Sequence, residues 1–167
     1  MELPLHPILV HFPIALLITS VLFDAAGVIV KREALREGAL WLLALGLVAG
    51  VAAGVAGLVA KEAAGKAGIA ESLIERHETL AFVTLAIFGT LLGYRLFLRN
   101  QLVRVTLAVY LIGALVGIGT LSATGYFGGH LVYEHGAGVK AMKSAPDRKS
   151  TRLNSSHSSV SRMPSSA

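Results

Sequence analysis

The chain has 167 residues, of which 54% are hydrophobic and only 15% are charged, and its mean hydropathy is +0.66. This composition excludes an ordinary soluble domain and is typical of an integral membrane protein. The chain has no cysteine, which excludes disulfides, thiolate metal clusters and covalent c-type haem attachment.

Four apolar runs follow one another along the chain, at residues 8–30, 38–60, 80–98 and 102–125. Each is close to the ~20 residues that a helix needs to cross a bilayer core. The first run has neither the basic start nor the cleavage site of a signal peptide. The first and third connections are short, and the second, residues 61–78, is longer and amphiphilic. Short connections favour antiparallel neighbours. We therefore predict an all-α integral membrane protein, a four-helix transmembrane up-down bundle formed by residues 1–146.

The basic residues give an orientation. The first and third connections hold six, closely placed at span ends, and the other side holds five that are more spread out. They are Lys31, Arg32, Arg36, Arg95, Arg99 and Arg104 against Lys61, Lys66, Arg76, Lys140 and Lys143. Cytoplasmic connections are enriched in lysine and arginine. We expect insertion in the bacterial cytoplasmic (inner) membrane, with both termini periplasmic and lipid as the main surrounding partner.

All five histidines before residue 147 fall on one side of such a bundle. They are His6, His11, His77, His130 and His135. Each alone can be an amphipathic anchor at the membrane boundary. Imidazole is also the commonest metal ligand near neutral pH and the usual axial ligand of b-type haem. The cluster therefore marks a candidate cofactor site.

His11 and His77 are the first choice of ligands, whether for b-type haem or for a transition metal. Each lies about one helical turn from the boundary of its span, and the helix of His77 is expected to start near the cap candidate Ser72. His6 is five residues from His11, about 140° around a helix, and so serves a different partner. His6 and His135 lie further out, where they can hold haem propionates, a second metal or a partner surface.

Two prolines lie in the same stretch as the first two histidines. Pro7 suits the first position of a helix, and Pro13 cannot donate to the carbonyl of Leu9. We expect them to fix where the helix starts and how His11 points. A rigid helix start without any ligand is the alternative.

The segment "GYFGGHLVYEHGAGV" follows the fourth span. Gly128 and Gly129 can bend the chain over the mouth of the bundle, and Gly136 is a candidate helix C-cap. His130 and Glu134 lie one turn apart. His135 reaches the bundle only if the chain bends.

Small residues and one carboxylate lie inside the spans. Gly46, Gly50 and Gly54 recur every four residues in the second span, and Gly113 and Gly117 do so in the fourth. Such ridges favour close helix approach and offer a route to a homo-oligomer; a flat slot for a macrocycle or quinone is the rival interpretation. Asp24 is expected to form an ion pair with Arg95, Arg99 or Arg104.

Three of these motifs together resemble a known family. "HPILVHFPIALL", the "RHE" before the third span and "GGHLVYEHGAGV" are similar to the bacterial membrane family catalogued as domain of unknown function 2231, over residues 5–140. The resemblance implies a four-helix membrane domain. Some members are fused to Rieske iron–sulfur domains, which implies electron transfer and a Rieske-type redox partner. The motif match carries over His6, His11, His77 and His135, but not His130.

Residues 147–167, "DRKSTRLNSSHSSVSRMPSSA", change abruptly in composition. They resemble a translated sequencing-library adapter, so we expect an artefactual, disordered C-terminal tail; a genuine Ser-rich tail is the alternative. The tail holds four basic residues and one acidic residue, so residues 1–146 keep 11 of the 15 basic and 9 of the 10 acidic residues, a net charge of +2. We expect no nucleic-acid partner.

Two functions follow as expectations. The first is a histidine-ligated b-type haem or transition-metal site for electron transfer in a small membrane protein. The second is a non-catalytic membrane subunit or scaffold without a cofactor. The sequence has no nucleophile–base constellation, phosphate loop or H-E-x-x-H motif, so an autonomous enzyme is not expected.

Overall fold

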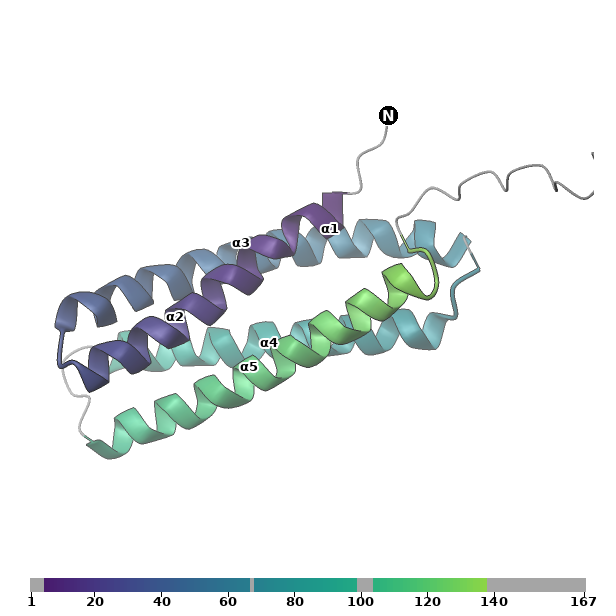
Figure 1. Ribbon diagram of the computed structural model, residues 1–167. Coiled ribbons are helices and arrows are strands. Elements are labelled where there is room, and N and C mark those ends of the chain that lie inside the picture. Colours follow the sequence, from purple (N-terminus) through teal and green to yellow (C-terminus); the bar gives the residue numbers. More distant parts are fainter. Residues whose placement is uncertain (1–4, 67, 99–103, 138–167) are drawn as a thin grey trace, which may run out of the picture.

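The computed structural model describes residues 5–66, 68–98 and 104–137, and every element there is a helix. The helices are α1 (Leu5–Leu9), α2 (His11–Ile29), α3 (Glu33–Lys66), α4 (Glu71–Phe97) and α5 (Arg104–Tyr133). They form an up-down bundle of four long rods, in which α1 continues into α2 (Figure 1). Four helices are long and apolar enough to cross a membrane. The predicted four-helix membrane fold is confirmed; residues 147–167 lie outside the described part.

The first rod is interrupted at a single residue, Val10, between α1 and α2. The Val10 amide donates to the carbonyl of His6 at 3.1 Å, and the Ile14 amide donates to Val10 at 3.4 Å. Pro13 has no amide proton, so one helical bond is missing at this point. Its buried ring lies instead near Gly50 of α3. The proline adjusts the helix without ending it.

Helices extend well past the apolar runs at the histidine end. The polar stretch expected as a long connection is mostly helix, because α3 runs to Lys66 and α4 starts at Glu71. Ile69, Ile74 and Leu131 form a small apolar cluster that stabilises this end. The predicted cap Ser72 is wrong: Ala70 occupies the cap position and makes no side-chain cap bond. Apolar packing substitutes for a polar cap here.

The two halves of the bundle are helical hairpins. The helices α2 and α3 pack chiefly on each other, as do α4 and α5, and the α3–α4 and α2–α5 contacts join the hairpins. The central core contains Leu17, Leu43 and Phe88. A methyl group built on Gly46 would lie 2.8 Å from Leu17, and one built on Gly117 would lie 3.0 Å from Phe88. The glycine ridges therefore serve helix packing within the chain.

Large apolar side chains cover the outside of the bundle. Examples are Trp41 (70% exposed), Val59 (76%) and Leu115 (65%). A water-soluble monomer rarely exposes so much contiguous apolar surface. In a bilayer the same surface contacts lipid tails, so the burial pattern agrees with a membrane-embedded bundle.

Candidate functional site

Two histidines meet at one end of the bundle. The ring centres of His6 on α1 and His77 on α4 are 6.1 Å apart, and the ring planes are at 82°. Both side chains are partly buried. These two residues come from different hairpins and lie 71 positions apart in the chain, so the contact exists only in the folded bundle.

Each imidazole is held by a backbone carbonyl of the second long helix of its own hairpin, α3 for His6 and α5 for His77. His6 Nδ1 lies 2.8 Å from the carbonyl oxygen of Ala53, and His77 Nδ1 lies 3.1 Å from that of Thr124. A carbonyl oxygen only accepts hydrogen bonds, so each Nδ1 carries the proton. In the neutral ring the lone pair is then on Nε2, which is the form that ligates metals.

Each ring also lies against a glycine one turn beyond that carbonyl. A methyl group at Gly57 would be 3.0 Å from Cε1 of His6, and one at Gly128 would be 2.9 Å from Cε1 of His77. Any side chain at these positions would displace the ring. The expected bend at Gly128 and Gly129 is wrong, because α5 runs through both residues as helix. Gly128 provides space for an imidazole instead.

His11 does not take the place expected for it. Its side chain is exposed, whereas His6 faces His77. Two facts account for this difference. His6 and His11 point about 140° apart on a helix, and α3 and α4 extend the bundle outward to the level of His6.

His135 lies next to His130, the histidine that the motif match leaves out. Their ring centres are 5.1 Å apart. The chain ends α5 and turns at Gly136, with φ of +69°, and the Gly136 amide donates to Val132 at 3.0 Å. The predicted glycine C-cap is confirmed. Four of the five described histidines therefore form two pairs, His6–His77 and His130–His135.

Polar bonds around the His6–His77 pair hold the surrounding helices. Lys61 of α3 donates to Glu78 of α4 at 2.7 Å, directly beside His77. The hydroxyls of Thr84 and Thr124 lie 3.1 Å apart and join α4 to α5. No group of three or more His, Cys, Asp or Glu side chains that could hold a metal ion occurs within the residues that the structure describes. From those residues, a metal at this end would draw its protein ligands from the two imidazoles.

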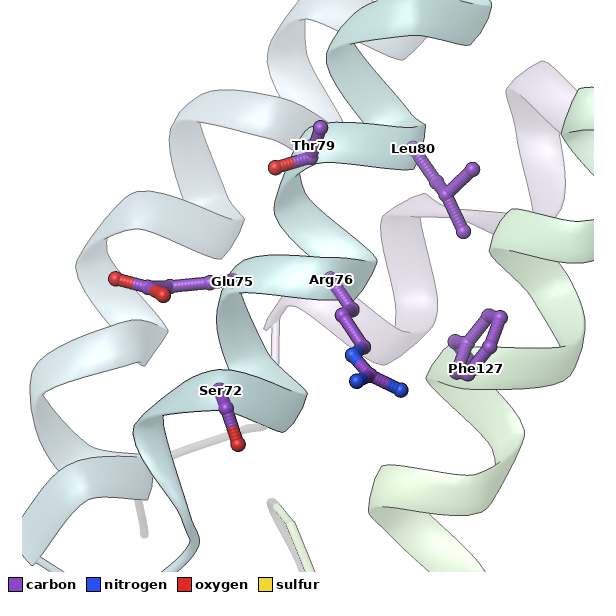
Figure 2. Close-up of a pocket in the computed structure, with 6 residues that line it drawn as sticks. All are labelled: Ser72, Glu75, Arg76, Thr79, Leu80 and Phe127. Carbon is purple, nitrogen blue, oxygen red and sulfur yellow. The ribbon is translucent and has the colours of Figure 1, made fainter.

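A groove of about 470 Å³ lies on the outer side of α4 and α5, beside this end (Figure 2). Its lining residues are Ser72, Glu75, Arg76, Thr79, Leu80 and Phe127. Figure 2 shows Arg76 and Leu80 extending toward Phe127, while Glu75 and Thr79 extend the other way. Neither His6 nor His77 lines it, so it is not a slot for a macrocycle between the imidazoles.

A second polar cluster lies buried at the opposite end of the bundle. Asp24 forms an ion pair with Arg95, which confirms the predicted ion pair and selects Arg95 among the three candidates. Tyr110 donates to Asp24 at 2.7 Å, and Arg95 also donates to the carbonyl of Arg36. The guanidinium lies 5.6 Å from the Tyr110 ring centre. Each charge is therefore satisfied by several partners, as a buried ion pair requires.

Sequence reasoning missed the partners that position the rings. A signal was present in the spacing. Each carbonyl partner follows its histidine by 47 residues, and each glycine follows its histidine by 51 residues (57 minus 6 and 128 minus 77). Two equal spacings, one in each half of the chain, indicate that both histidines occupy the same kind of position.

Comparison with known proteins gives one match. The family model described as "Predicted membrane protein (DUF2231)" matches residues 2–141. No curated protein and no solved structure matches the chain.

Proposed function

The chain belongs to the DUF2231 family of predicted membrane proteins, and for this member we propose a metal-binding function in electron transfer. In this proposal His6 and His77 bind one redox-active transition-metal ion at one face of the inner membrane. The proposal replaces His11 by His6 as the partner of His77, because His6 is the residue that faces it.

The spacing of the two rings is the observation that carries the proposal. Imidazole nitrogens bind metal ions at about 2.0–2.1 Å, so two rings on opposite sides of one ion have centres about 6 Å apart, and rings at a tetrahedral angle lie closer. The centres of His6 and His77 are 6.1 Å apart before any ion is added. This separation suits an ion that has the two imidazoles on opposite sides.

The hydrogen bonds at Nδ1 support the same proposal. Metal-ligating histidines almost always donate the other ring N–H to a carbonyl, carboxylate or water, which fixes the ring and raises its basicity. Ala53 and Thr124 provide such carbonyls at 2.8 and 3.1 Å. Each ring is therefore held by the kind of hydrogen bond that metal-ligating histidines make.

Ligand chemistry favours copper or iron. Imidazole suits copper, iron, nickel and zinc, and of these copper and iron change oxidation state readily in proteins. With two protein ligands, further positions on the ion would be open to water, to a small ligand or to a partner. A soluble electron-transfer protein, such as a Rieske-type protein, is the redox partner in this proposal.

A b-type haem is a variant of the same proposal. Two axial imidazoles on haem iron have a similar centre-to-centre distance, but the macrocycle needs a flat space between the hairpins. The described grooves are not lined by His6 or His77. A metal ion without a macrocycle is therefore the first choice.

A cofactor-free membrane subunit is the second candidate. The observation in its favour is that both Nδ1 bonds also tie helices together, α1 to α3 and α4 to α5. In that function the histidine end would pack helices and present a surface to a partner protein. Metal content separates the two candidates directly.

The test is the metal content of the purified protein. The protein is produced in cells supplied with copper, iron, zinc and haem precursor. Elemental analysis measures bound metal, and absorbance spectra before and after dithionite detect haem. We expect about one bound ion per chain in the parent, and loss of it in His6→Ala and in His77→Ala. His11→Ala is the matched control and should keep the ion. A Soret band would identify haem. A parent without ion or haem, or retention in both variants, rejects the proposal.

A further inference from the structure

We infer that the domain consists of two copies of one helical hairpin, residues 5–66 and 76–137, related by a shift of 71 residues and a two-fold axis parallel to the helices. The inference rests on residue spacing, burial and contacts, and it does not depend on the proposed function. It also assigns a role to the Asp24–Arg95 pair, as the point where the two copies are made different.

One histidine and three glycines of the first hairpin repeat at this shift. His6 and His77 are 71 residues apart. The glycines Gly46, Gly54 and Gly57 correspond in the same way to Gly117, Gly125 and Gly128. The two hairpins thus have these residues in the same register.

The positions of buried residues repeat at this shift, although most of the residue types differ. Eight buried positions in the first hairpin have buried counterparts 71 residues later. They are Pro13, Leu17, Ser20, Asp24, Ala39, Leu43, Gly46 and Gly50, with counterparts Thr84, Phe88, Leu91, Arg95, Tyr110, Ala114, Gly117 and Leu121. Both hairpins therefore turn the same face toward the centre of the bundle.

Individual contacts repeat as well. The bond from His6 to Ala53 and the bond from His77 to Thr124 join equivalent atoms of equivalent residues. The close approach of Gly46 to Leu17 recurs as that of Gly117 to Phe88. A common architecture alone explains similar helix lengths, but it does not require the same side-chain contacts at a constant shift.

The axis is located by equivalent residues that touch each other. A residue meets its own counterpart only where the symmetry axis passes between them. His6 touches His77 at one end of the bundle, and Asp24 pairs with Arg95 at the other. These points are 18 residues apart (24 minus 6), about 27 Å along a helix at 1.5 Å per residue. The axis therefore runs along the bundle between the first and third rods.

At Asp24 and Arg95 the two hairpins carry opposite charges at equivalent positions, and these positions contact each other. Two copies of the first hairpin would bring two carboxylates together on the axis, and two copies of the second would bring two guanidinium groups together. Like charges in a buried contact are strongly unfavourable, and unlike charges attract. The pair therefore makes each hairpin select the other one as its partner and reject a copy of itself.

A side-chain hydroxyl supports the pair from the second hairpin only. Tyr110 donates to Asp24, while its counterpart in the first hairpin is Ala39. Exchanging Asp24 with Arg95 moves the carboxylate to α4, where a tyrosine at position 39 and not at position 110 would donate to it. This gives an experiment that depends on the symmetry and not merely on the presence of an ion pair.

The experiment compares thermal unfolding in detergent and folded yield for exchange variants. Asp24→Arg alone and Arg95→Asp alone should lose most folded protein, because like charges meet. The double exchange should recover most of that loss. Ala39→Tyr with Tyr110→Ala should lower the unfolding midpoint in the parent but raise it in the double exchange. The proposal fails if the double exchange is no better than the single variants, or if the tyrosine transfer has the same sign in both backgrounds.

A permuted chain provides an independent measurement should the exchange variants yield no protein. It places residues 76–137 first, then residues 67–75 as the linking segment, then residues 5–66; residues 71–75 are the start of α4 in the parent. Two equivalent hairpins on a two-fold axis should accept this order, with a midpoint close to that of the parent. A control that opens the chain at residue 31, inside the first hairpin, should be clearly less stable. Failure of the permuted chain to fold would overturn the inference.

Discussion

His6 and His77 place their ring centres 6.1 Å apart at one end of the bundle, and each ring donates a hydrogen bond from Nδ1 to a carbonyl of its own hairpin. The two residues act as a pair because their surroundings are the same. The site is therefore sensitive to changes in helices that carry no histidine ligand, which gives the first prediction.

Gly57→Ala and Gly128→Ala are expected to disturb the histidine pair. The added methyl groups would lie 3.0 Å from Cε1 of His6 and 2.9 Å from Cε1 of His77, so each ring must move and its carbonyl bond must weaken. Metal content and the unfolding midpoint of both variants should fall. Gly125→Ala is the matched control, because its methyl group meets nothing within 4 Å and alanine favours helix. Equal behaviour of all three variants would contradict the prediction.

Asp24→Leu should lower stability without emptying the histidine site. The substitution leaves Arg95 buried without its carboxylate, which typically costs about 3–5 kcal/mol. Replacing Arg95 by Met in the same chain should recover much of this loss, because no unpaired charge then remains. Chemical denaturation in detergent measures both changes. Loss of bound metal at an unchanged unfolding free energy would contradict a structural role.

Tyr110→Phe should destabilise the bundle by a smaller amount. The variant keeps the ring against Arg95 and removes only the hydroxyl that donates to Asp24 at 2.7 Å. A lost hydrogen bond to a charged group typically costs about 1.5–3 kcal/mol. Tyr94→Phe also removes a single hydroxyl, but the bond lost is longer, 3.2 Å to a neutral carbonyl. It should therefore lower the free energy of unfolding by less. The reverse order of the two losses would count against the prediction.

Cysteine labelling should place the two ends of the bundle on opposite sides of the membrane. The chain has no native cysteine, so Ala34→Cys and Ala70→Cys, both at exposed positions, report one side each. With periplasmic termini, Ala70→Cys reacts with an impermeant thiol reagent from the periplasm and Ala34→Cys does not. Reaction of Ala70→Cys only from the cytoplasm would reverse the orientation. Reaction of both from the same side would reject the four-span topology.

Deletion of residues 147–167 should leave expression, membrane insertion and metal content unchanged. The family match ends at residue 141, and the deleted stretch resembles translated adapter sequence. Fluorescence-detected size exclusion of parent and truncated protein is a sufficient measurement. A clear loss of folded protein on truncation would show that the tail contributes.

The sequence alone determined much of this protein. Four apolar runs of membrane-spanning length, joined by short connections, predict the bundle because backbone polar groups in lipid must be satisfied within a helix. The same patterns place the histidines on one side and require a partner for Asp24, since a lone carboxylate is costly in hydrocarbon. These results need only hydropathy and chain direction.

Only the tertiary structure decided which residues meet. Sequence reasoning chose His11 from its depth in the apolar run, whereas the bundle extends beyond that run and brings His6 to His77. It treated Gly128 as a hinge, whereas the glycine makes room for an imidazole. It found Asp24 but not Tyr110, because a tyrosine in an apolar run is inconspicuous. Depth and hydropathy fix a residue along the membrane normal, but rotation and contact between helices depend on side-chain packing, which single-helix periodicity does not contain.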